Sequence, residues 1–255
     1  MSSHVSVSLR DKQIAALYRM LDLHNPASTN NNREEDGLLP EALPVVKDDE
    51  PIWKVLVLDK TGMSIVSSVL RVADLRARGI TIHLSLTSKR ATIPDVSLQL
   101  GAVWWHGTNE GNQVPAIYFV EPTKANLDMI IGDLKTPLYS PVHIDATSSF
   151  PRSVLEEFAG QVAATNVAES IASVFDNYVN FIVSEPNLFS LGMPTAYSLL
   201  NSANTSDKDL DDAVDQIVSG LFNVCATMGV VPIIRAPKDG RFHASHLSLS
   251  LILYL

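Results

Sequence analysis

Residues 53–62 of the chain are Trp53-Lys54-Val55-Leu56-Val57-Leu58-Asp59-Lys60-Thr61-Gly62. Val55–Leu58 is an unbroken apolar run, which is typical of a strand that is buried on both faces of a parallel sheet. Asp59–Gly62 interrupts that run, and Met63–Leu70 then carries apolar residues at helical spacing. The stretch therefore predicts a strand, a tight turn and a helix, in that order.

Asp59 is a candidate functional residue, because α/β proteins commonly bind ligands at the carboxyl ends of parallel strands. Asp59–Gly62 resembles the phosphorylated-aspartate motif of P-type ATPases and haloacid-dehalogenase-like enzymes. That chemistry needs further carboxylates to hold Mg²⁺ and a lysine to stabilise the phosphoryl group. Met63 departs from the P-type pattern, and neither Gly132-Asp133 nor Asp239-Gly240 supplies the second carboxylate. We therefore predict that Asp59 caps the next helix, with a Mg²⁺-dependent phosphohydrolase that uses Asp59 as the alternative.

Strands and helices alternate on both sides of this stretch. The other strands that the sequence predicts are Ile80–Leu86, Val114–Val120, Val142–Asp145 and Tyr178–Val183. The predicted helices are Leu9–Leu23, Asn126–Leu134 with Thr123 as its N-cap, Pro151–Ala163 and a short Val167–Val174. This alternation predicts an α/β fold, in which helices flank a parallel sheet.

The composition suggests two unequal domains. We expect the first to span residues 1–184 and to contain a flexible linker at 26–51, which is rich in Asn, Asp, Glu and Pro. Residues 185–240 begin a second α/β domain, in which a helix ends at Gly229 and Val230–Arg235 begins a strand. Because it has only one clear strand, this second domain is expected to be partial.

Charge and cysteine content exclude several classes of function. The 255 residues are 46% hydrophobic and 18% charged, and the formal net charge of −9 argues against a nucleic-acid-binding surface. Cys225 is the only cysteine, which excludes an internal disulfide and zinc sites built from cysteine pairs. His243 and His246 have no third ligand at a suitable spacing. The sequence predicts a soluble protein without cofactor, metal or membrane-inserted segment.

Four stretches carry a family resemblance. They are Trp53–Ile65, Val114–Thr123, Val174–Ile182 and Gly229–Arg235. They resemble the SM family of Sec/Munc-type syntaxin-binding proteins, and within it the Sly-type branch of the ER-to-Golgi pathway. The resemblance runs from about Leu9 to Gly240, so it covers both expected domains.

The resemblance implies a binding protein rather than an enzyme. SM proteins bind syntaxins and assembled SNARE bundles, and they promote vesicle docking and membrane fusion. In the Sly-type branch, a short N-terminal peptide of the syntaxin docks on the first domain, with an aromatic anchor in an apolar pocket. The resemblance also implies a monomer in the cytoplasm that reaches ER and Golgi membranes through its SNARE partners.

The same resemblance places the peptide pocket on the helix Pro151–Ala163 and the segment after it. The residues it implies are Leu155, Phe158, Ala159, Val162, Ile171 and Val174. Without the resemblance, the helical members of this set would be read as the core face of their helix, since apolar stripes at helical spacing usually pack inward.

The sequence departs from the family pattern in two places. Residues 97–113, which include Trp104-Trp105, intervene where relatives run almost directly into the next strand. We expect an insertion or a retained intron there. Residues 241–255 match nothing in the family pattern, and the third domain that templates SNAREs is expected to be missing. A non-functional fragment from a mis-spliced transcript is therefore a further alternative.

Overall fold

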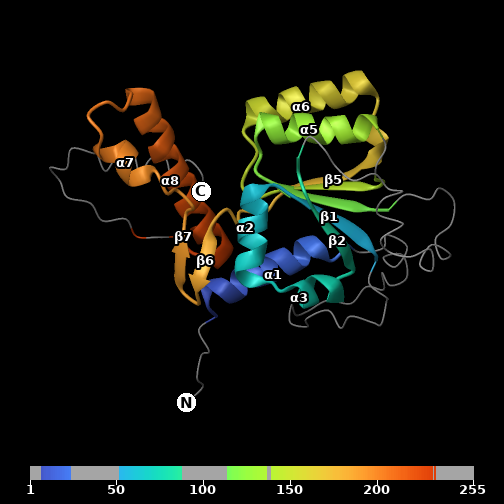
Figure 1. Cartoon of the computed structure of the whole chain (residues 1–255), viewed down its shortest axis with the longest axis horizontal. Helices are drawn as coiled ribbons and strands as arrows, with labels where there is room; N and C mark the ends of the chain where they lie inside the picture. Colours follow the sequence, from blue (N-terminus) through green and yellow to red (C-terminus); the bar gives the residue numbers. More distant parts are fainter. Residues whose placement is uncertain (1–6, 24–51, 88–113, 137–138, 232, 234–255) are drawn as a thin grey trace, which may run out of the picture.

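The computed structural model describes residues 7–23, 52–87, 114–136, 139–231 and 233. Its main feature is a five-stranded parallel sheet in the order β2-β1-β3-β4-β5, beside a two-stranded antiparallel sheet of β6 and β7 (Figure 1). The strands are β1 Lys54–Leu58, β2 Ile80–Ser85, β3 Ala116–Val120, β4 Val142–Ala146, β5 Ile171–Asp176, β6 Ile182–Glu185 and β7 Leu188–Ser190.

Helices cover both faces of the larger sheet, as Figure 1 shows. The helices are α1 Leu9–Leu21, α2 Lys60–Val69, α3 Val72–Ala77, α5 Lys124–Lys135, α6 Arg152–Thr165, the 3₁₀ turn η3 Ala168–Ser170, α7 Ala196–Asn201 and α8 Asp207–Met228. One apolar core lies between the sheet and α1, α2 and α3, and a second lies between the sheet and α5 and α6. The predicted α/β fold with helices on both faces is therefore confirmed.

The central strands are buried on both faces. Every residue of β1 and β3 is buried. Leu56 and Leu58 enter the core beneath α1 and α2, whereas Val55 and Val57 enter the core beneath α5 and α6. The prediction that Val55–Leu58 is a strand buried on both faces is therefore confirmed. Every position of such a strand is apolar because none of them faces solvent.

The tight turn after β1 is absent, because α2 begins at Lys60 directly after Asp59. The Asp59 side chain accepts a hydrogen bond from the backbone N–H of Gly62, at 2.7 Å. The predicted helix cap at Asp59 is confirmed, and the expected four-residue turn Asp59–Gly62 is wrong. The cap lets Lys60, Thr61 and Gly62 form the first turn of the helix rather than a separate loop.

Two predictions about the end of the first domain are wrong. Val167–Val174 is not a helix, because a short 3₁₀ turn leads directly into β5, which pairs in parallel with β4. Tyr178–Val183 is not the fifth strand of the sheet, since β6 begins only at Ile182 and pairs with β7. Asn166 ends α6 in the left-handed conformation, at φ 55°, and so frees the chain to extend along the edge of β4.

After β7, the described part of the second unit is helical. Ser206 caps α8 through the backbone N–H of Asp209, and Gly229, at φ 69°, ends it as predicted. Val230, Val231 and Ile233 are not in a strand. The remainder of that expected strand lies outside the described residues, as do the linker 26–51, the insertion 97–113 and the segment 241–255. The domain boundary at residue 184, within β6, stays a prediction.

Candidate peptide-binding surface

Asp59 is held in a structural arrangement that leaves little of its carboxylate for chemistry. One oxygen accepts from the Gly62 N–H, and the other accepts from the Glu121 N–H and from the Asn126 side-chain amide, both at 2.8 Å. The side chain is buried. A nucleophilic aspartate needs a free oxygen directed at phosphorus, whereas here both oxygens join α2 to the end of β3 and the start of α5. The geometry therefore favours the cap over the phosphohydrolase alternative.

Within the described ranges, no group of three or more His, Cys, Asp or Glu side chains is placed to hold a metal ion. No helix in that part of the chain is both long enough and apolar enough to cross a bilayer.

The helix α6 buries only part of its apolar stripe. Phe158 and Val162 are buried in the core beneath α5 and α6. Leu155 is 39% exposed, and Ala159 is exposed. The stripe that the sequence predicts is therefore divided into a core-facing half and a solvent-facing half.

One flank of α6 is held against α5, which lies beside it (Figure 1). Lys124 forms an ion pair with Glu157, and the Gln161 amide donates to the Asp128 carboxylate at 3.1 Å. Since an α-helix turns by about 100° per residue, Leu155 lies on the side of the buried seam that is opposite to Glu157 and Gln161. The open half of the stripe therefore faces away from α5.

The strand β5 supplies apolar side chains at the edge of the same sheet face. Ile171 is paired in register with Val142, and Val174 with Ile144. Because Val142 and Ile144 belong to the core beneath α5 and α6, their register partners point to that face as well. Ile171 is half-buried against this core, and Val174 is 37% exposed.

The accessible apolar side chains of α6 and β5 together make up the α6–β5 surface, which consists of Leu155, Ala159, Ile171 and Val174. The structure places all six predicted site residues on one side of the sheet, but Phe158 and Val162 are core residues beneath the accessible part. The described surroundings carry Glu169 and Asp176, both exposed, while the nearby Arg152 guanidinium donates to Glu156 at 2.8 Å. Such a surface can accept an apolar side chain, and its acidic surroundings favour a basic neighbour.

Sequence reasoning passed over Phe175, which is the most exposed apolar side chain of β5 at 61%. Its register partner is Asp145, so Phe175 points to the sheet face opposite to the α6–β5 surface. Asp145 is itself buried, and this burial raises the pKa of its carboxyl to about 6. The β-branched and aromatic residues at 171, 174 and 175 were a usable strand signal, but the spacing of the apolar positions 171 and 174 also suits a helix.

A family model described as the Sec1 family matches residues 54–252. The bounds of this match enclose residues 97–113 and 241–252, and the expectations of an insertion and of an unmatched final segment stay predictions. Protein SLY1 of Saccharomyces cerevisiae is 41% identical over 239 residues, which cover 94% of this chain and 32% of that protein. SEC1 family transport protein SLY1 of Arabidopsis thaliana is 32% identical over 236 residues, with 92% of this chain and 32% of that protein covered.

Among solved structures, the crystal structure of Sly1p in complex with an N-terminal peptide of Sed5p superposes with a TM-score of 0.75. The two sequences are 40% identical, and the superposed region covers 96% of this chain and 38% of the Sly1p chain. The chain thus spans about a third of the length of the two SLY1 relatives. Because the family model matches well over half of its residues, the chain belongs to the Sec1 family.

Proposed function

We propose that this chain binds the N-terminal peptide of a syntaxin-type SNARE through the α6–β5 surface, and that it serves ER-to-Golgi membrane transport by binding rather than by catalysis. The observation that carries the proposal is the open half of the α6 stripe, beside a half-exposed edge strand. The solved relative, Sly1p, is bound to an N-terminal peptide of Sed5p, and it is 40% identical to this chain.

The physical basis is the burial of one large apolar side chain of the peptide. Leu155 and Val174 are each more than one-third exposed, so an aromatic ring placed between them would remove apolar area from water on both partners. Phe158 and Val162 form the firm base of that contact, because both are packed in the core. A basic peptide residue near Glu169 or Asp176 would add charge complementarity.

The proposal also covers where the chain works. It acts in the cytoplasm as a monomer and is held at ER and Golgi membranes by its SNARE partners, including assembled SNARE complexes. This location rests on the family relationship.

Titration of the purified chain with a fluorescent N-terminal peptide of Sed5p tests the proposal. Val174→Glu and Leu155→Glu should each weaken binding by at least about tenfold, because a carboxylate would enter the apolar contact. Val72→Glu is the matched control, since Val72 is 52% exposed but lies on α3, beyond the other edge of the sheet. Phe158→Lys is less informative, because Phe158 is buried and its replacement also unfolds the core.

Two results would contradict the proposal. If Val174→Glu and the parent chain bind the peptide with equal affinity, the α6–β5 surface is not the site. If Val72→Glu weakens binding as strongly as Val174→Glu does, the loss reflects a general change of charge or stability. Thermal unfolding of all variants separates these cases, since the exposed substitutions should leave the melting temperature nearly unchanged.

A further inference from the structure

The strand β2 forms the edge of the sheet opposite to β5. In the described part of the chain it pairs with β1 alone, in a parallel ladder. From Thr81 to Ser85, no residue of β2 is fully buried. An edge strand presents backbone N–H and C=O groups that can pair with another extended segment.

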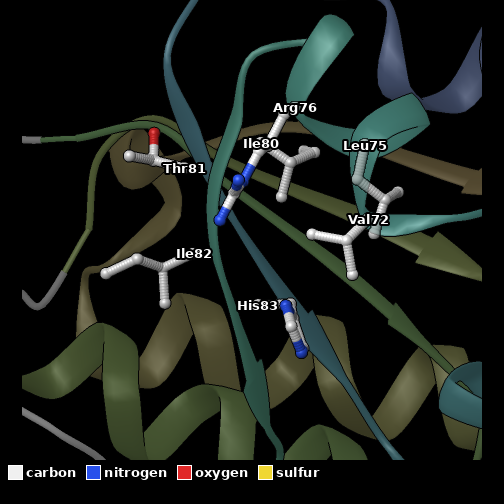
Figure 2. Close-up of a pocket in the computed structure, with 7 residues that line it drawn as sticks. All are labelled: Val72, Leu75, Arg76, Ile80, Thr81, Ile82 and His83. Carbon is white, nitrogen blue, oxygen red and sulfur yellow. The ribbon is translucent and has the colours of Figure 1, made fainter.

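A pocket of about 220 Å³ lies between this edge and α3 (Figure 2). It is lined by Val72, Leu75, Arg76, Ile80, Thr81, Ile82 and His83. Its volume is below the roughly 300–1,000 Å³ of small-molecule sites, so it suits a protruding side chain better than a cofactor. Leu75 and Ile80 are buried, which gives the pocket an apolar base.

The charge beside the pocket is positive, on a chain whose net charge is −9. Figure 2 shows the Arg76 side chain extending from α3 toward β2, and no hydrogen bond or ion pair of that side chain is found within the described residues. The carboxylate of Asp74 accepts from the Arg71 backbone N–H at 2.8 Å, so it is already used in capping α3. Arg78 is also engaged, in an ion pair with Asp22.

The two sheet edges therefore differ in the charge that they present. Arg76 lines the pocket beside β2 and is exposed, whereas Glu169 and Asp176 are exposed at the two ends of β5. A negatively charged strand would be attracted to β2 and repelled from β5. We propose that the edge of β2 and the α3 pocket form a second docking surface, for an extended acidic segment of a partner protein that adds a strand to the sheet.

In this complex, alternate side chains of the added strand point to the same face, as in any β-strand. One apolar side chain enters the pocket against Leu75 and Ile80, and a carboxylate two residues along the added strand, on the same face, meets the Arg76 guanidinium. Planar two-pronged contact with a carboxylate is the geometry that arginine favours. Because β2 and β5 lie at opposite edges, a peptide on β2 leaves the α6–β5 surface free.

The test uses the whole chain, labelled with ¹⁵N, and a short synthetic valine–glutamate peptide in which these two residues alternate along one face of the strand, with threonine at the positions between them. We expect chemical-shift changes centred on β2 and α3. Arg76→Glu should weaken binding by at least about tenfold, because it replaces attraction with repulsion. Arg152→Glu, a charge reversal of an exposed arginine on α6, is the matched control and should bind as the parent does.

Two control peptides examine the binding mode. Replacement of glutamate by lysine should abolish binding, and N-methylation of alternate residues should do the same, since it removes the hydrogen bonds of an added strand. Binding should also weaken as salt is raised, because the charges that face the peptide are exposed to solvent. Val174→Glu should leave binding of the valine–glutamate peptide unchanged. The proposed surface at β2 is therefore tested independently of the proposed syntaxin site.

Several outcomes would overturn the proposal. Shift changes at β5 in place of β2 would show that charge does not select the edge. If Arg76→Glu and the parent chain bind the peptide with equal affinity, Arg76 does not contact it and the proposed site is wrong. Binding that is seen only after deletion of residues 24–51 would identify the acidic segment of the chain itself as the occupant. A dimer in light scattering that Arg76→Glu dissociates would identify a second copy instead.

Discussion

Gly62 shows at the scale of a single residue why the sequence after β1 is so restricted. A Cβ atom at this position would lie 2.4 Å from the Phe119 carbonyl oxygen and 3.1 Å from the Asp59 side chain. Only glycine lets the first turn of α2 approach β3 this closely. Packing therefore explains the motif that resembles a phosphorylation site. Asp59 caps α2, and the missing side chain of Gly62 leaves space for the backbone of β3.

Gly62→Ala should lower the free energy of unfolding by about 2–3 kcal/mol, because the backbone carbonyl that it meets cannot move aside as a side chain could. Gly132→Ala is the matched control. Gly132 also lies inside a helix, but an added Cβ there meets nothing within 4 Å, so the helix should gain up to about 1 kcal/mol. Urea unfolding of both variants measures the difference, and equal stability would contradict the close approach.

Asp145 should make stability depend on pH. Burial raises the pKa of its carboxyl from 3.8 to about 6, although the Asn177 amide donates to it at 2.9 Å. Between these two pKa values, the folded chain holds a proton that the unfolded chain has released. The contribution of this group to the free energy of unfolding therefore falls as pH rises from 3.8 to about 6, and it stays low above that range.

Asp145→Asn should remove this loss, since the amide is neutral at every pH and keeps an acceptor for Asn177. We expect the variant to be more stable than the parent by about 2 kcal/mol at pH 8, with the gap closing toward pH 4. Asp212→Asn, on an exposed aspartate of α8, should show no such trend. Urea titrations at the two pH values check this, and a gap that widens toward pH 4 would refute it.

At the scale of elements, β5 shows how a neighbouring strand can override local sequence. Residues 171–176 carry apolar side chains at positions that also suit a helix, so spacing alone misassigned them. In the folded chain β4 offers an unpaired edge, and hydrogen bonds to that edge make the extended conformation the favourable one. The candidate site depends on this outcome, since in the strand Val174 points to the sheet face that α6 covers.

The helix α1 illustrates a second contact between distant elements. Its Gln13 side chain is fully buried, and the amide donates to the carbonyl oxygens of Val179 and Phe181, at 3.3 and 2.7 Å. The segment between β5 and β6 is also held to the end of β4, because the N–H groups of Asn177 and Val179 donate to the carbonyl oxygens of Ala146 and Thr147. Gln13 therefore joins the first helix of the chain to the start of β6.

Gln13→Leu should cost about 1–2 kcal/mol, because it keeps the volume but removes the donor of the 2.7 Å hydrogen bond to the Phe181 carbonyl oxygen. The Val179 carbonyl oxygen still accepts from the Phe181 N–H in this variant. Gln161→Leu is the control, since Gln161 also donates a hydrogen bond but lies in an exposed setting, and its replacement should cost less than about 0.5 kcal/mol. Thermal unfolding of the two variants measures this. Equal losses of stability in the two variants would show that the buried amide stabilises the fold no more than the exposed one does.

At the scale of the whole molecule, stability should be concentrated in the larger sheet. Every residue of β3 is buried, whereas α7 buries none of its residues and Tyr197 on it is 79% exposed. Backbone amides of β3 should therefore exchange with deuterium only on global unfolding, and those of α7 at least about a hundredfold faster. Hydrogen exchange followed by NMR measures both rates. Uniform protection across the two elements would contradict this division.

The central strands, the Asp59 cap and the two ends of α8 were predictable from local sequence, because each depends on residues that are close together in the chain. Burial on both faces requires an apolar run, and a helix cap requires a side chain within three residues. Three features depend on the tertiary structure: residues 171–176 form a strand, Phe158 is buried while Leu155 is exposed, and Arg76 lies beside the edge strand β2. Each of these depends on which distant element occupies the adjacent space, and local spacing does not encode that choice.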